Sequence, residues 1–279
     1  MRPARRCVAR GGSGPRRDAT VAARFEAAVE SYEAHAGVQG STARRLLDEL
    51  ECACPHLCPR CVLDVGCGTG LLTALVRERF DAAWVCAVDV AEGMVRTCAR
   101  RFSGDDRLSC VVADARRFAV RSGFDLIVSN AALHWMPPIS RTLRGLAGLL
   151  QPGGVMAAAV MVAGTLRELH SARRRVAPDK RPRRKLPRPC EVLAAVERSG
   201  LRVLRRHTEV VTAHYPDARA FLKAIHEQGV TGGDFSRAQR PLNRTELQRL
   251  VAEYDRRYAA EGGGVVASYR LLYVVGERQ

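Results

Sequence analysis

The sequence of 279 residues lacks a long hydrophobic run, contains almost no lysine and shows no internal repeat. Its longest apolar run, residues 155–164, is too short for a membrane-spanning helix, which needs about 20 residues. The 24 glycines and 13 prolines follow no collagen-like period, which excludes fibrous and generally disordered chains. With 47% hydrophobic and 27% charged residues, the composition predicts a soluble globular protein.

Only three of the 45 basic residues are lysine, so arginine supplies almost all of the net charge of +16. A surplus of positive charge attracts polyanions, either nucleic acid or an acidic protein. A basic surface that is only solvated by water would explain the same charge equally well. Residues 1–17 hold six arginines and no acid, and we expect residues 1–18 to be a flexible basic leader. Because no apolar signal stretch follows, we expect a cytoplasmic protein whose ten cysteines are reduced.

From residue 61 onward, short apolar runs alternate with helical stretches. This alternation requires crossover connections and predicts a mostly parallel sheet that helices cover on both faces. The predicted strands are residues 61–65, 84–88, 108–112, 124–129, 155–160, 201–212 and 266–275. The predicted helices are residues 19–50, 71–80, 93–102, 139–150, 191–199, 217–227 and 244–259. Residues 172–188 carry nine basic side chains interrupted by prolines, and we expect a surface loop there rather than a nucleic-acid arm.

The strongest local pattern is a predicted strand that runs into a glycine turn before a helix, Val62-Leu-Asp-Val-Gly66-Cys-Gly68-Thr-Gly70. Glycine allows positive φ and lets the backbone pass close to a ligand. A dinucleotide-binding fingerprint would need glycine or alanine at the position of Leu71. With Asp64 ahead of the glycines, the spacing instead resembles the first motif of class I S-adenosylmethionine methyltransferases.

A second acid, Asp89, ends the next predicted strand, nineteen residues beyond Gly70. A carboxylate there can accept hydrogen bonds from both ribose hydroxyls of a nucleoside. Val90 and Met94 follow closely and are expected to pack on the adenine. Asp89 alone could be a helix cap, as could Asp114 farther along the chain, but acids that occur in order at strand ends make the pattern specific.

Asp114 ends the third predicted strand, and Asn130 ends the fourth. The same resemblance implies that Asp114, with Ala115, receives the adenine amino group and that Asn130 borders the transferred methyl. The Asn/Asp-Pro-Pro-Tyr motif of adenine-methylating enzymes is absent at this point. Pro189-Cys190 lies too far along the chain to be a cytosine-methylating nucleophile. We therefore do not expect nucleic acid as the partner.

Five potential metal ligands lie between the end of the first predicted helix and the first residue of the first predicted strand: Cys52, Cys54, His56, Cys58 and Cys61. The Cys58-Pro-Arg-Cys61 spacing suits zinc, but a structural zinc site usually pairs two such knuckles across a longer loop. We favour a reduced, partly buried connector over a zinc site and expect no metal.

Segments near the two ends of the chain narrow the resemblance to one family among these methyltransferases. The opening from Phe25 through Tyr32 and His35 to Gln39 is similar to the lid helix of malonyl-acyl-carrier-protein O-methyltransferases of biotin synthesis. Residues 164–169, 221–225 and 242–246 resemble the same family in the same order. His134-Trp135 departs from the Gln-Trp that the family commonly has.

The resemblance implies a Rossmann-like fold with a mostly parallel seven-stranded sheet, an N-terminal lid helix and a small helical insertion near the C-terminal end. It divides residues 19–279 into a lid and connector (19–60), a cofactor-binding core (61–164), and an insertion with the final strands (165–279). Asp64, Gly66, Gly68 and Gly70 would hold the methionine end of S-adenosylmethionine, and Tyr32 and Gln39 would close over it.

The implied reaction is methylation of the free carboxylate of malonyl-acyl carrier protein, or of malonyl-coenzyme A, which gives the methyl ester and S-adenosylhomocysteine. A carboxylate is already ionised at pH 7, so no catalytic base is expected. The alternatives are a methyltransferase for another small carboxylic acid or for RNA, and a non-catalytic RNA-binding relative.

Overall fold

The computed structural model describes residues 18–118, 123–180, 185–229 and 241–279. The expected leader falls outside these ranges except for Asp18, with which the first helix begins. Residues 181–184 of the basic segment also lie outside them.

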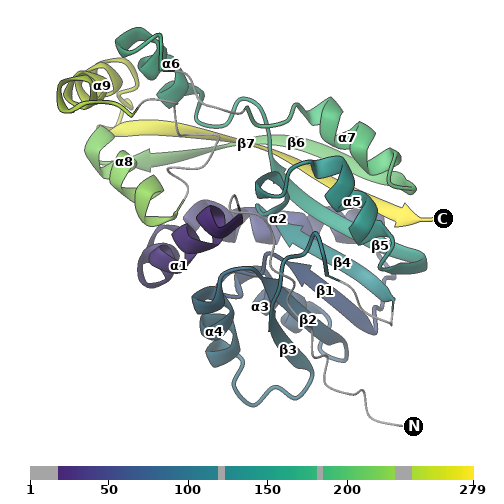
Figure 1. Ribbon diagram of the computed structural model, residues 1–279. Coiled ribbons are helices and arrows are strands. Elements are labelled where there is room, and N and C mark those ends of the chain that lie inside the picture. The colour runs from purple at the N-terminus through teal and green to yellow at the C-terminus, as the bar shows by residue number, and fades with distance from the viewer. Residues whose placement is uncertain (1–17, 119–122, 181–184, 230–240) are drawn as a thin grey trace.

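Seven strands form a single sheet in the order β3-β2-β1-β4-β5-β7-β6 (Figure 1). β7 runs antiparallel to both of its neighbours, whereas the pairs from β3 to β5 are parallel, which confirms the predicted α/β fold. The strands are β1 (Cys61–Val65), β2 (Trp84–Asp89), β3 (Leu108–Val112), β4 (Phe124–Asn130), β5 (Leu150–Met161), β6 (Leu201–Tyr215) and β7 (Val265–Arg278).

Helices cover both faces of the sheet, because the crossovers between parallel strands place them there. α5 and α7 pack on one face, and α2, α3 and α4 pack on the other (Figure 1). The helices are α1 (Asp18–His35), α2 (Gly37–Ala53), α3 (Leu71–Arg79), α4 (Glu92–Arg101), α5 (Ile139–Ala147), α6 (Arg167–Val176), α7 (Pro189–Glu197), α8 (Ala218–Glu227) and α9 (Arg244–Arg257), with a short 3-10 turn, η1 (Leu133–Trp135). The predicted helical insertion corresponds to α8 and α9, which lie between β6 and β7.

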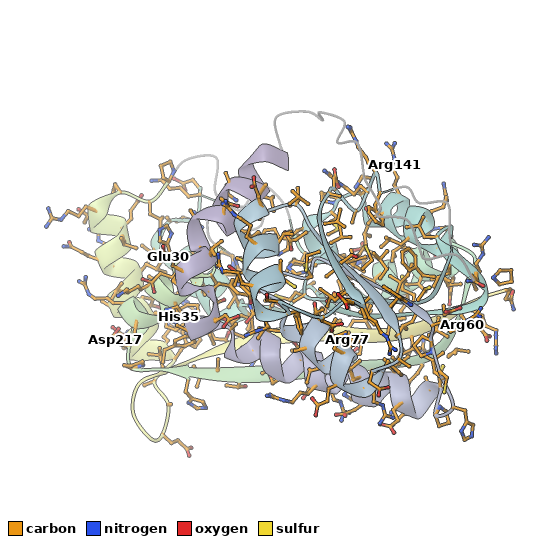
Figure 2. The ribbon with its side chains drawn as sticks, turned by 90° about the horizontal axis from the view of Figure 1, so that it is seen from below. Glu30, His35, Arg60, Arg77, Arg141 and Asp217 are labelled. Atoms are coloured by element: carbon orange, nitrogen blue, oxygen red, sulfur yellow. The ribbon has the colours of Figure 1, made fainter. Side chains whose placement is uncertain are left out.

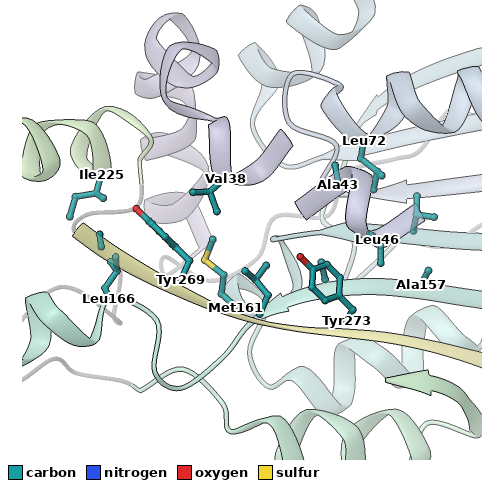
Figure 3. Packing of buried hydrophobic residues seen from close by; sticks show 14 of the residues in the cluster. Val38, Ala43, Leu46, Leu72, Ala157, Met161, Leu166, Ile225, Tyr269 and Tyr273 are labelled. Carbon is teal, nitrogen blue, oxygen red and sulfur yellow. The ribbon is translucent and has the colours of Figure 1, made fainter. Parts of the chain in front are cut away.

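The core on the α2 side joins the N-terminal helices to the last strand of the sheet. Figure 3 shows Val38 and Leu46 of α2 beside Met161 of β5 and Tyr269 and Tyr273 of β7. All five side chains are at least 90% buried. Residues from opposite ends of the chain therefore hold one continuous core together.

The prediction of a loop over residues 172–188 is wrong for its first five positions, which belong to α6. The helix continues through Arg173, Arg174 and Arg175 and ends at Val176, two residues before Pro178. Proline cannot continue a helix and disfavours helical backbone in the residue before it. The prolines therefore set the end of α6 but do not prevent the helix.

Charged side chains are distributed around the molecule, and Arg60, Arg141 and Asp217 all point outward (Figure 2). Within the four described ranges, the helices are too short or too polar to cross a bilayer.

We predict that Leu46→Ala will lower the free energy of unfolding by about 2–5 kcal/mol, because the truncation leaves a cavity in a fully buried site. Leu247→Ala is the matched control, since this helical leucine is 46% exposed and its loss should cost about 0.5 kcal/mol or less. Urea denaturation of both variants measures the difference. Equal losses would contradict the central position of α2 in the core.

Candidate active site

A cavity opens at the carboxyl ends of β1, β2, β3 and β4 and encloses about 780 Å³ together with its open mouth. Ligands of open α/β sheets bind at this edge, and the size suits a nucleoside-containing ligand. Nine of the predicted site residues line it: Tyr32, Gly66, Gly68, Asp89, Val90, Met94, Asp114, Ala115 and Asn130. Gln39, Asp64 and Gly70, which were also predicted, are not part of its wall.

The glycine turn after β1 forms the floor of the cavity. Gly66, Gly68 and Gly70 have φ values of +73°, +54° and +92°, in the region that side chains disfavour. A Cβ atom on Gly66 would collide with that of Ala132, and one on Gly70 would lie 2.9 Å from Cys98 Sγ. Both contacts require glycine, so the turn presents bare backbone to the cavity.

Asp89 fixes this turn from the end of β2. Its Oδ2 accepts the Gly68 N–H at 3.0 Å, and its Oδ1 accepts the Ala91 N–H at 2.9 Å. Burial raises the pKa of Asp89, although these two N–H groups act in the opposite direction. Burial, with the nearby Asp89, also raises the pKa of Tyr32, so the phenol keeps its proton. Each carboxylate oxygen has a further lone pair that a ligand hydroxyl can use.

Asp114, at the end of β3, is paired with a residue that the sequence patterns did not single out. Arg116 Nε lies 2.9 Å from Asp114 Oδ1, and its terminal nitrogen lies 2.7 Å from Oδ2. Although burial opposes the change, the hydrogen bonds from Arg116 lower the pKa of Asp114. Arg116 also lines the cavity, so the predicted adenine side of the site carries a bidentate ion pair.

Asp64 lies beneath the glycine turn and is fully buried. Its Oδ2 accepts the Thr73 hydroxyl at 2.6 Å, and its Oδ1 has no hydrogen-bond partner within the described ranges. Burial raises its pKa from 3.8 to about 7. A buried carboxyl with one unsatisfied oxygen is costly, and cationic ligand groups are its natural complement.

Asn130 connects the cavity to α2. Its side-chain nitrogen donates to the Gln39 carbonyl at 2.8 Å, and its oxygen accepts the Thr42 hydroxyl at 3.0 Å. Gln39 is buried behind this contact, off the cavity wall, and its Oε1 has no hydrogen-bond partner in the part of the chain described. The structure therefore places Gln39 where it can orient Asn130 through its backbone.

Aromatic side chains that sequence reasoning did not assign to the site cover the cavity. Phe25 of α1 packs edge-on against Trp135 at a ring-centre distance of 5.8 Å and against Tyr32 at 6.3 Å. Phe25 and Trp135 both line the cavity, as does Met136. Phe25 belongs to the opening motif, but its pairing with Trp135 depends on tertiary packing across 110 residues.

Contacts from its middle and from its C-terminal end hold α1 over the cavity. Glu26 Oε2 accepts the N–H of Gly93 at the start of α4, at 2.7 Å. At the C-terminal end of α1, His35 Nε2 lies 2.8 Å from Glu227 of α8, and the Ser31 hydroxyl donates to the Glu227 carbonyl at 2.9 Å. Figure 2 shows His35 at the end of α1 that faces α8. These contacts give α1 the position that a lid requires.

The remaining histidine and cysteine candidates lie away from the cavity wall. His134 is buried beside Trp135, and burial lowers its pKa to about 3, so the imidazole is neutral. Cys52 and Cys58 are exposed, and across the described ranges no three Cys, His, Asp or Glu side chains are arranged to hold a metal ion.

The raised pKa of Asp64 makes a testable prediction about stability. The folded state holds this proton more tightly than the unfolded state, so stability falls as the pH rises from about 4 to about 7. Asp64→Asn keeps the contact with Thr73 and removes the titration. We expect the variant to gain on the order of 3 kcal/mol relative to the wild type between pH 4 and pH 8.

Urea denaturation at the two pH values measures this gain, and Asp81→Asn, at an exposed position, is the control. An Asp64→Asn curve that parallels the wild type would show that the buried carboxyl does not titrate in this range.

The chain is similar to known methyltransferases in sequence and in fold. The family described as "Methyltransferase domain" matches residues 62–154, which hold the glycine turn, Asp89, Asp114 and Asn130. The fold resembles that of a phosphoethanolamine N-methyltransferase from Haemonchus contortus, solved with S-adenosyl-L-methionine, with a TM-score of 0.58 and 16% identity over 96% of this chain and 61% of that one.

Two curated relatives are similar along nearly their whole length. The malonyl-acyl-carrier-protein O-methyltransferase of Geobacter sulfurreducens is 30% identical over 91% of this chain and 96% of the relative. That of Pseudescherichia vulneris is 32% identical over 92% and 96%. The chain therefore belongs to the malonyl-acyl-carrier-protein O-methyltransferase family, with a class I methyltransferase fold.

Proposed function

We propose that this protein transfers the methyl group of S-adenosylmethionine to the free carboxylate of malonyl-acyl carrier protein, an early step of pimeloyl and biotin synthesis. The products are the malonyl methyl ester and S-adenosylhomocysteine. The observation that carries the proposal is the convergence of the glycine turn, Asp89, Asp114 and Asn130 on one cavity beneath α1. Two relatives at least 30% identical, both named for this reaction, support the choice of substrate.

The residues present fit S-adenosylmethionine. The glycine turn forms a cradle that a Cβ atom would fill, and the unsatisfied Asp64 Oδ1 lies beneath it. In the proposed assignment, Asp64 and the three glycines hold the methionine end, Asp89 binds the ribose, and Asp114 with Ala115 holds the adenine. Val90 and Met94 would pack on its ring, while Asn130 would border the methyl. Bound S-adenosylmethionine supplies a methyl group activated by a sulfonium.

The cavity provides positioning rather than proton transfer. Its titratable wall residues within the described ranges are Tyr32, Asp89, Asp114 and Arg116. Tyr32 holds its proton, and the other three are engaged in hydrogen bonds. A malonyl carboxylate is already ionised at pH 7, so the reaction needs alignment and partial desolvation of the attacking oxygen. The aromatic cover of Phe25 and Trp135 suits that need.

The proposal keeps the division into a lid and connector (19–60), a cofactor-binding core (61–164), and an insertion with the final strands (165–279). The substrate is presented on acyl carrier protein, or as malonyl-coenzyme A, in the cytoplasm. Acyl carrier proteins are acidic, so the net charge of +16 favours their encounter with this surface.

The test is mass spectrometry of purified protein incubated with S-adenosylmethionine and malonyl-acyl carrier protein. We expect a gain of one methyl group on the malonyl carrier and none on acetyl-acyl carrier protein, which lacks the free carboxylate. No gain from a protein that binds S-adenosylhomocysteine in calorimetry would reject this substrate. Other small carboxylic acids and RNA would then be assayed. If the protein shows neither methyl transfer nor S-adenosylhomocysteine binding, the remaining alternative is a non-catalytic RNA-binding relative.

We further predict that Asp89→Ala will weaken S-adenosylhomocysteine binding about tenfold or more, because hydrogen bonds to a charged group contribute roughly 1.5–3 kcal/mol. Calorimetry measures the affinity. Asp106→Ala, at an exposed position, is the control, and thermal unfolding of each variant checks that the glycine turn survives. Unchanged affinity of a folded Asp89→Ala protein would refute the ribose role.

A further inference from the structure

Three cysteines meet behind the glycine turn, and the proposed reaction uses none of them. Cys67 belongs to the turn, Cys98 to α4 and Cys110 to β3. They form a small apolar cluster with Ala87 and Phe102. Cys98 is fully buried and Cys67 is 6% exposed, whereas Cys110 is partly exposed on the edge strand of the sheet.

The thiols of both Cys110 and Cys67 act on the Cys98 sulfur, and Cys110 has the larger effect on its pKa. The Cys110 thiol donates to Cys98 Sγ at a distance of 3.6 Å. A disulfide has an S–S length of about 2.05 Å, so the sulfurs need to approach by only about 1.5 Å. Hydrogen bonds from Cys110 and, secondly, from Cys67 lower the pKa of the Cys98 thiol, and the contact with Cys98 raises the pKa of Cys110. The thiolate is the reactive form, so the buried partner is the better nucleophile.

The same sulfur supports the glycine turn. A Cβ atom on Gly70 would lie 2.9 Å from Cys98 Sγ, which shows how closely the backbone of the turn packs on it. Cys67 lies in the same cluster, and its thiol contacts the Gly68 carbonyl at 3.6 Å. A displacement of Cys98 Sγ toward Cys110 therefore removes packing from beneath the turn.

We propose that Cys98 and Cys110 are an oxidation-sensitive thiol pair, and that their disulfide loosens the glycine turn and weakens ligand binding in the cavity. The effect on S-adenosylmethionine rests on the proposed function, whereas disulfide formation does not.

The oxidant is a hydroperoxide, and hydrogen peroxide is the simplest. Peroxide reaches the partly exposed Cys110 and converts its thiol to a sulfenic acid, releasing one water. The Cys98 sulfur then attacks the Cys110 sulfur, forms the S–S bond and displaces hydroxide. The hydroxide takes the proton lost by Cys98 and becomes the second water. Two thiols and one peroxide thus give one disulfide and two waters.

Peptide mapping tests the pair directly. The full-length protein is oxidised with hydrogen peroxide, its remaining thiols are alkylated, and it is digested with trypsin. We expect peptide 97–100, which holds Cys98, to be linked to peptide 108–116, which holds Cys110. A linkage of Cys98 to peptide 61–77, or no linkage of Cys98 while exposed Cys52 or Cys190 is oxidised, would overturn the proposal.

Calorimetry with S-adenosylhomocysteine tests the consequence. We expect oxidation to weaken binding roughly tenfold, or about 1.4 kcal/mol, because the turn loses its packing against Cys98 Sγ, and we expect reduction to restore the affinity. Cys110→Ser should remove the sensitivity to oxidation. Cys86→Ser is the matched control and should stay sensitive, because Cys86 packs on the opposite face of the sheet.

Equal affinities of the reduced and the disulfide-linked protein would refute the coupling to the turn. If the reduced protein binds no S-adenosylhomocysteine, the proposed cofactor is rejected. The rate at which Cys67 is alkylated then measures how loosely the glycine turn is packed. An increased rate in the linked protein supports the proposal, and an unchanged rate rejects it.

Discussion

The candidate site depends on how closely the backbone of one turn approaches its neighbours. Gly66 packs against Ala132 and Gly70 against Cys98, at separations that leave no room for a Cβ atom. The turn can then offer its N–H groups, and Asp89 takes that of Gly68. A side chain at either glycine would push the turn away from Ala132, which follows β4, or from α4, and would open the floor of the cavity. The same cavity is lined by Asp89, by Asn130 and by the aromatic side chains that cover it. A displaced floor would therefore change the distance of the turn from all of them.

Much of this arrangement is predictable because its signals are local. Parallel strands covered on both faces read as short, continuous apolar runs, and the predicted starts of the first four strands are the observed ones. The ends of parallel strands share one edge of the sheet, so Asp89, Asp114 and Asn130 could be placed together from their order alone. The predicted start of β5 was five residues late, since Pro152 and two glycines hide its first part.

The parts that sequence reasoning missed depend on contacts between distant segments. Nothing local indicates that Phe25 meets Trp135, or that three thiols from a turn, a helix and a strand share one cluster. Arg116 was hidden among the many arginines, and only its geometry distinguishes it as the partner of Asp114. Gln39 was assigned to the cavity from its motif, but the break between α1 and α2 places it in the helix behind.

The antiparallel position of β7 has a consequence for how the chain folds. β6 pairs along its whole length with β7, and the outer edge of β5 is also completed by β7. During synthesis on the ribosome, residues 201–215 therefore have no neighbouring strand to pair with until residues 265–278 have emerged. A nascent chain of this kind exposes long unpaired strand edges, which favour association between chains. Because hydrophobic association weakens on cooling, expression at low temperature favours the folded protein over aggregates without any change in the folded structure.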